Sequence, residues 1–221
     1  FSNEGCSDRL ITFISVYGIK ISCKITIFFS YIKKKAYLCK QIIQNHTMST
    51  TSTHYVYQEP AIEFVTVAVQ LCLYLEQAEE QERADFIEKM LCLLPLLYLK
   101  ARLLPKATEE MDGYPERFVT EYEYESMRQA IAQKLGSDDA YLEVFVEDMR
   151  YSDEPITAFI SENIADIYQE VKDLACNYQT REEAVMNDAL VSCLEAFEQH
   201  WGQKLLNVLR PLHTLSLHVD E

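Results

Sequence analysis

Residues 155–174, PITAFISENIADIYQEVKDL, contain the pattern that decides the fold. Apolar residues recur every three or four positions while acidic residues occupy another face, as in an amphipathic helix that packs against a core. Because proline fits the first turn of a helix, Pro155 is the predicted start of this helix. The predicted apolar seam consists of Ile156, Ile160, Ile164, Ile167, Val171 and Leu174.

The chain beyond this helix predicts a second and longer one. Thr180 and Glu183 have the spacing of a capping box, in which each side chain binds the backbone N–H of the other residue. The apolar stripe continues to Pro211, so at about 1.5 Å per residue the helix would be about 40 Å long. Gly202 lies inside it, at a cost of about 1 kcal/mol relative to alanine, and we expect it to permit close helix packing. The stripe consists of Met186, Leu190, Cys193, Phe197, Trp201, Leu205 and Val208.

Three further helices are predicted upstream from periodic apolar residues, capping residues and prolines. Pro95 lies inside the second helix, which we expect it to kink. The loop between the second and third helices, residues 105–119, contains two prolines and a glycine. The three helices begin near Pro60, span about 83–104, and run from a Thr120–Glu123 capping box to Gly136.

Residues 138–151, DDAYLEVFVEDMRY, are ambiguous. Apolar and acidic residues alternate as in a strand, but one strand has no evident partner, so we predict an extended connection. The expected fold class is therefore all-α, a single bundle of about five helices over residues 59–215. A flexible polar arm at 48–58 and a short tail at 216–221 complete this domain.

Residues 1–47 differ in composition from the rest of the chain. They hold nine isoleucines, against seven in the following 174 residues, and the first methionine is Met48. We interpret them as upstream sequence translated from a misplaced start, with Met48 as the genuine N-terminus. The alternative is a membrane or targeting segment at 10–32, in which Lys20 and Lys24 would each cost about 2.5–3.5 kcal/mol at the bilayer centre.

Charge separates the two parts of the chain and limits the classes of partner. Residues 1–47 carry a net charge of +5, and the remainder carries −20. Such an acidic body repels phosphate backbones and anionic lipids, so we expect no direct nucleic-acid binding and, if residues 1–47 are not native, no membrane binding. A protein partner, in particular a basic one, or solubility alone explains the charge. Seven cysteines without a CxxC pair fit the reducing cytoplasm.

Recognisable catalytic motifs are absent from the sequence, which has no P-loop, GxSxG, HExxH or CxxC pattern. We therefore predict no catalytic residue, cofactor or metal ion, and favour a non-enzymatic interaction or accessory protein. The alternative is a Mg²⁺-dependent hydrolase of a small phosphorylated molecule that uses carboxylates borne on helices. Its candidate ligands are two pairs at helical spacing, Glu79 with Glu82 and Glu170 with Asp173.

Three segments resemble an uncharacterised bacterial, Bacteroidetes-type family, domain of unknown function 5063. They are EVFVED (143–148), ENIADIYQEVKDL (162–174) and HWGQKLLNVLRPLH (200–213), and the resemblance covers roughly residues 63–213. It implies an acidic helical domain without an established activity. Genes of this kind are associated with neighbours in RNA metabolism, including an exonuclease, so an acidic adaptor for a basic RNA enzyme is the implied role.

The matching segments also supply candidate binding residues on the two long helices. We expect Asp166 or Tyr168 to pair with His200 or Arg210 across these helices and to hold the bundle in register. A small binding site at the same crossing is the alternative. The candidate binding residues are Asp166, Tyr168, His200, Trp201, Lys204 and Arg210.

Overall fold

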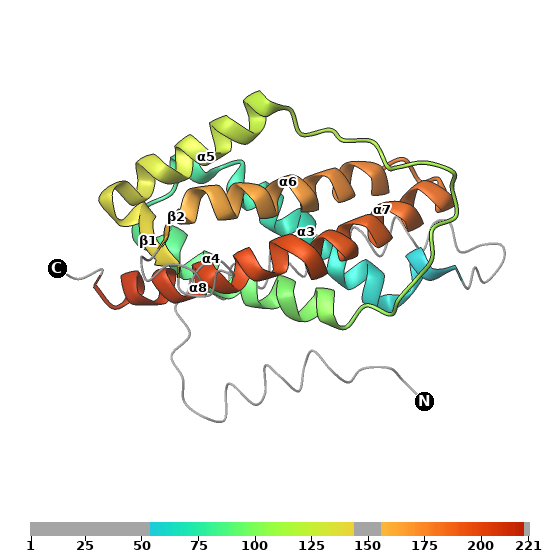
Figure 1. Cartoon of the computed structure of the whole chain (residues 1–221), viewed down its shortest axis with the longest axis horizontal. Helices are drawn as coiled ribbons and strands as arrows, with labels where there is room; N and C mark the ends of the chain where they lie inside the picture. Colours follow the sequence, from blue (N-terminus) through green and yellow to red (C-terminus); the bar gives the residue numbers. More distant parts are fainter. Residues whose placement is uncertain (1–53, 144–155, 219–221) are drawn as a thin grey trace. The chain divides into compact units, whose positions relative to one another are not determined.

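The computed structural model describes residues 54–143 and 156–218, which belong to one compact unit, residues 52–221. This unit is a helical bundle, so the predicted all-α class is confirmed (Figure 1). Its α-helices are α3 (Glu59–Leu75), α4 (Arg83–Arg102), α5 (Glu121–Leu135), α6 (Ile160–Tyr178), α7 (Glu183–Ala196) and α8 (Gly202–Ser216). The short elements are 3₁₀ helices at Tyr55–Tyr57, Ala78–Glu80 and Gly136–Asp139, a π-helical turn at Phe197–Trp201, and strands β1 (Ala140–Glu143) and β2 (Ile156–Phe159).

Helix α6 lies at the centre of the bundle, in contact with α3, α5, α7 and α8. The predicted seam is buried from Ile160 to Leu174, but its first member, Ile156, belongs to β2. The predicted helix start is therefore wrong, and Pro155 itself lies outside the described residues. The buried carboxylate of Asp139 explains the later start, since it accepts hydrogen bonds from the N–H and the hydroxyl of Ser161, both at 2.7 Å.

The two strands form an antiparallel pair with Ala140 opposite Phe159 and Glu143 opposite Ile156. The extended connection predicted for 138–151 is thus wrong in its first part, which is a 3₁₀ turn followed by a paired strand. Residues 144–151 lie outside the described part of the chain. The sequence pattern did not predict this pairing, because the residues of β2 continue the helical period of α6 and so resemble the start of that helix.

Helices α7 and α8 together form the long C-terminal element, joined through the π-helical turn (Figure 1). The predicted capping box at its start is wrong, because Thr180 belongs to the turn that ends α6 and donates to the Asn177 carbonyl at 2.8 Å. The helix also continues through Pro211 to Ser216 instead of ending at the proline. The other predicted box, Thr120 with Glu123, is present at the start of α5.

Gly202 makes its close contact within its own helix rather than with another helix. A Cβ atom at this position would lie 2.5 Å from the Phe197 carbonyl oxygen and 2.8 Å from the Phe197 ring. The π-helical turn brings this carbonyl to the N–H of Gly202. Only a residue without a side chain fits there, so the glycine permits the turn.

Substitution Gly202→Ala is expected to lower the free energy of unfolding by about 1–3 kcal/mol, because the added methyl group overpacks the π-helical turn. Urea unfolding followed by circular dichroism measures this change. The matched control is Gly113→Ala, since a Cβ at Gly113 meets nothing within 4 Å. Equal unfolding midpoints for the two variants would contradict the assignment.

The described residues test only the last part of the predictions made for the N-terminal region. The hypotheses about residues 1–47 lie outside the described residues, as does most of the predicted arm, 48–58. The end of this arm differs from the prediction, because Tyr55–Tyr57 forms a 3₁₀ helix in which Val56 is fully buried. The Tyr178 hydroxyl donates to the Val56 carbonyl and so attaches this turn to α6. Across the described ranges, no helix has both the length and the apolar character that a bilayer crossing requires.

Candidate functional site

Residues 105–119 form a strap that runs from α4 to α5 without secondary structure of its own. Figure 1 shows it leaving the end of α4, passing the end of the bundle beside α7, and returning to α5 along the opposite side. Loops of this length are uncommon in compact domains, and an ordered one is often functional. Because the strap forms neither helix nor sheet, its backbone N–H and C=O groups need hydrogen-bond partners in other parts of the domain.

Two buried residues at the start of α7 bind the first half of the strap. The Asp188 carboxylate, whose residue is only 1% exposed, accepts hydrogen bonds from the N–H groups of Glu110 at 2.8 Å and Met111 at 2.9 Å. The neighbouring Asn187 amide donates to the Thr108 carbonyl at 2.7 Å and to Asp188 at 3.0 Å. These side chains therefore fix the backbone around residues 108–111.

Two buried residues of α6 bind the second half in the same way. The Asp173 carboxylate accepts from the N–H groups of Phe118 at 2.8 Å and Val119 at 2.9 Å. The Asn177 amide donates to the Glu116 carbonyl at 2.8 Å. Hydrogen bonds from backbone N–H groups to a buried carboxylate are among the stronger ones in proteins, so both ends of the strap are held in one conformation.

Arg117 adds an ion pair to the second half. Its guanidinium lies 2.9 Å from Glu170 and 3.5 Å from Asp173, and the hydrogen bond to Glu170 is the main cause of its raised pKa. A hollow of about 20 Å³ lies beneath this pair, with Ser192 and Cys193 in its lining. Such a volume holds about one water molecule, so it is not a substrate pocket.

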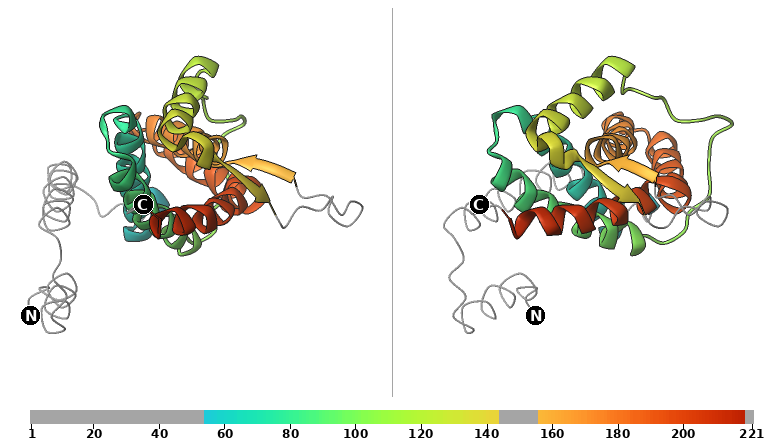
Figure 2. Two further views of the ribbon diagram at one scale, coloured as in Figure 1. Left: turned by 90° about the vertical axis from the view of Figure 1, so that its left-hand side faces the viewer. Right: turned by 60° about the vertical axis from the view of Figure 1, so that its left-hand side comes forward.

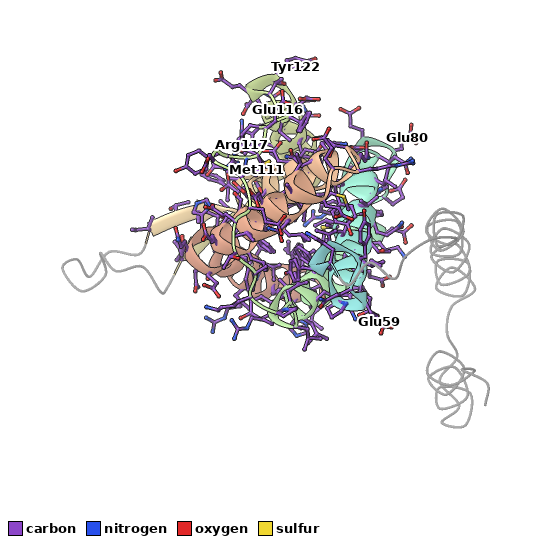
Figure 3. The ribbon with its side chains drawn as sticks, turned by 90° about the vertical axis from the view of Figure 1, so that its right-hand side faces the viewer. Glu59, Glu80, Met111, Glu116, Arg117 and Tyr122 are labelled. Carbon is purple, nitrogen blue, oxygen red and sulfur yellow. The ribbon has the colours of Figure 1, made fainter. Side chains whose placement is uncertain are left out.

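The anchored strap and the first turn of α5 present aromatic and acidic side chains to solvent. Tyr114 is 91% exposed and Tyr122 is 81% exposed. Over residues 107–125 the net charge is −6, with Arg117 as the single cation. Figure 3 labels Met111, Glu116, Arg117 and Tyr122 on the side of the bundle that the strap crosses. The acidic residues are Glu109, Glu110, Asp112, Glu116, Glu121, Glu123 and Glu125, of which Glu125 is half-buried and paired with Arg128 at 2.6 Å.

The crossing of α6 with α8 contains a different pair from the one predicted. Asp166 accepts hydrogen bonds from the ammonium group of Lys204 and, at 2.9 Å, from the Tyr124 hydroxyl of α5. Burial, strengthened by the nearby Asp166 carboxylate, raises the pKa of the Tyr124 phenol. These contacts tie three helices together, which is a structural role.

The remaining candidates at this crossing do not converge on one site. Tyr168 donates to Glu76 of the α3 end at 3.1 Å, so the pairings predicted for it with His200 or Arg210 are not formed. Trp201 is fully buried and its indole N–H donates to the Cys193 carbonyl at 3.0 Å. His200 and Arg210 are both exposed. The six candidates therefore divide between the core, two separate polar contacts and the surface.

The four carboxylates proposed as Mg²⁺ ligands do not form one site either, because one pair binds an arginine and the other pair belongs to a different part of the bundle. Glu170 and Asp173 bind Arg117, and Asp173 is buried rather than solvent-facing as the sequence pattern had indicated. Glu79 and Glu82 are exposed near the turn between α3 and α4. The described residues contain no group of three or more His, Cys, Asp or Glu side chains that could hold a metal ion.

The comparisons with known proteins identify the domain. A family model described as "Domain of unknown function (DUF5063)" matches residues 55–218. The chain belongs to this family. The matched range contains the strap, the helices that anchor it and the crossing of α6 with α8, so these features lie within the family's domain. The resemblance inferred from the three sequence segments is confirmed.

A solved structure has the same fold. It is the crystal structure of a Bacteroides fragilis protein, a structural genomics target, with 42% sequence identity and a TM-score of 0.67. The match covers 73% of this chain and 95% of that chain. A search of curated proteins found no match. The comparisons thus give the family and the fold without an activity.

Sequence reasoning missed the strap anchors, the residues Asp173, Asn177, Asn187 and Asp188. Two signals were available. Asn187 and Asp188 interrupt an apolar stretch of α7, and the predicted loop 105–119 is too long to leave its backbone groups without partners. Together these signals predict polar side chains on an inward helix face that bind a loop.

Proposed function

We propose that this protein is a non-catalytic cytosolic interaction protein whose strap surface binds a basic segment of a partner protein. The strap surface consists of residues 107–125. The observation that carries the proposal is the combination of two highly exposed tyrosines with seven carboxylates on a backbone that buried side chains hold in place.

Fixing the backbone favours binding because the entropy of ordering a loop is lost when the protein folds, not when the partner arrives. Asp188 and Asp173 provide this ordering from the two helices below the strap. An ordered surface of this kind is suited to recognition of one shape.

The chemistry of the surface selects a cationic partner. Exposed tyrosine rings bind guanidinium and ammonium groups through cation–π contacts worth about 0.5–1 kcal/mol at exposed sites. Carboxylates around them attract the same groups and speed association through the long-range field. An arginine- and lysine-containing segment satisfies both features, with Tyr114 and Tyr122 as the central contacts.

Proteins of RNA metabolism carry such segments, because lysine and arginine neutralise phosphates. We therefore propose a basic RNA-metabolism protein as the partner class. Direct binding of RNA by this chain is disfavoured by its own charge. The hydrolase alternative receives no support from the site described above, since the carboxylates that it requires bind Arg117 or lie apart.

The test removes charge from the strap surface and, as a control, the same amount elsewhere. The triple variant Glu109→Gln, Glu116→Gln, Glu121→Gln is expected to bind a fluorescent peptide of alternating arginine and glycine roughly tenfold more weakly than the parent chain. The matched control is Glu79→Gln, Glu80→Gln, Glu82→Gln, which removes three exposed carboxylates outside the strap. Fluorescence anisotropy at low and at physiological salt measures both.

The two triple variants distinguish binding by the strap surface from attraction of the peptide by the net charge of the chain. Binding by the parent chain should weaken as salt rises, because the contacts are exposed ion pairs. Equal losses in the two triple variants would mean that charge alone attracts the peptide, and the proposed surface would then be wrong. Absence of peptide binding by the parent chain at low salt would remove the proposal altogether.

A further inference from the structure

Helix α4 exposes an apolar face on the side away from the core. Its inward residues, including Phe86, Leu94 and Leu97, are fully buried, whereas Leu96 is 37%, Leu99 51% and the C-cap Leu103 58% exposed. Helical spacing places the exposed apolar residues on one face. This outward face consists of Cys92, Pro95, Leu96, Leu99 and Leu103, all exposed.

The face lies at the edge of the bundle, where α4 packs beside α3 and α8 (Figure 2). Monomeric proteins seldom leave several large apolar side chains together in water. The strap surface is of a different kind, because its exposed residues are aromatic and acidic, and it does not account for the exposed leucines of α4. We therefore expect the outward face of α4 to be covered by a binding partner other than the one proposed for the strap surface.

Two charges flank this face symmetrically. Glu88 lies seven residues before Pro95, and Arg102 lies seven residues after it. At about 100° per residue the two side chains project within about 40° of each other, so both lie on the same edge of the face. Both are exposed, and neither forms an ion pair with another residue of the described part of the chain.

This arrangement is complementary to itself. If two α4 helices pack antiparallel about a two-fold axis at Pro95, Glu88 of each copy lies opposite Arg102 of the other, and Pro95 and Leu96 of the two copies meet between the two ion pairs. A parallel arrangement would instead oppose Glu88 to Glu88 and Arg102 to Arg102. A two-fold contact needs a surface that is complementary to itself in this way.

We propose that the outward face of α4 binds a second copy of this chain, in an antiparallel two-fold dimer centred on Pro95. A contact made by one helix from each copy is smaller than the 1,200–2,000 Å² of a typical stable interface. The dimer therefore dissociates on dilution. This contact is independent of the strap surface and of the partner proposed for it.

The experiment measures the mass of the full chain by sedimentation equilibrium over a range of concentrations. We expect a monomer–dimer equilibrium for the parent chain and a monomer for Leu99→Glu, which places a charge at the centre of the apolar face. Glu88→Arg and Arg102→Glu should each weaken the dimer at least about tenfold, because each opposes like charges across the interface. The double variant Glu88→Arg, Arg102→Glu should restore the dimer.

Restoration is decisive because the two residues cannot pair within one chain. They are 14 positions apart, which is about 21 Å along the helix. Glu182→Arg, in the turn between α6 and α7, is the matched control and should leave the equilibrium unchanged. Thermal unfolding by circular dichroism establishes that each variant is folded.

The other outcomes overturn the proposal. A parent chain that stays monomeric at every concentration has no such dimer. A dimer that persists in Leu99→Glu uses another surface. A double variant no better than the single variants means that Glu88 and Arg102 do not face each other across a two-fold axis.

Discussion

Replacement of Asp188 by alanine is expected to release the first half of the strap and to lower the free energy of unfolding by about 2–4 kcal/mol. The loss leaves the N–H groups of Glu110 and Met111 without their acceptor, together with one hydrogen bond of the Asn187 amide. It also opens a cavity beneath the strap, since Asp188 is almost completely buried.

Hydrogen exchange locates this effect as well as measuring it. In the Asp188→Ala variant, the amides of Glu110 and Met111 should exchange much faster, while the core amides of α6 change little beyond the global loss of stability. The matched control is Asp112→Ala, an exposed carboxylate of the same strap. Unchanged exchange at residues 110 and 111 would contradict the anchoring role.

Replacement of Trp201 by alanine is expected to lower the free energy of unfolding by about 3–5 kcal/mol. The indole is fully buried, packs against the Phe197 ring at a centroid distance of 4.7 Å, and donates to the Cys193 carbonyl. Its loss empties the largest buried side-chain volume of the described core.

Substitution Tyr114→Ala is the matched control for this prediction, because it removes another large aromatic side chain from a residue that is 91% exposed. Urea unfolding followed by circular dichroism should show a change of less than about 0.5 kcal/mol for this control. The control should nevertheless weaken binding of the arginine–glycine peptide. A small stability loss for Trp201→Ala would place the indole outside the core.

The parts of the fold that depend on local periodicity were predictable from sequence. The seam from Ile160 to Leu174 repeats over four turns, and the capping box at Thr120 is a pattern of two residues three positions apart. Such signals need no knowledge of distant residues. They gave the helices of the bundle and placed the strap between α4 and α5.

The errors arose where a distant partner decides the local structure. Ile156 continues the helical period of α6, but pairing with Glu143 draws it into a strand. Thr180 has the spacing of a capping residue, but it lies in the turn that follows α6 and donates to the Asn177 carbonyl. Asp173 has the spacing of a surface carboxylate, yet it faces the strap 54 residues earlier in the chain.

The candidate site also has one part that the sequence predicted and one part that depends on distant residues. The crossing of α6 with α8 was found from sequence, since the two helices carry the segments that resemble the family, but the contact pairs Asp166 with Lys204 and not with His200 or Arg210. The strap surface was not found, because its order depends on side chains of two helices that follow it in the chain. No periodic pattern relates Asp188 to Met111.

The most direct test of the central claim is a titration of the isotope-labelled full chain with the arginine–glycine peptide, followed by amide chemical shifts. Binding through the strap surface predicts shifts concentrated in residues 107–125, including Tyr114 and Tyr122, and their disappearance when both tyrosines are replaced by alanine. Shifts spread evenly over the acidic surface, or an unaltered titration in the double tyrosine variant, would contradict the claim.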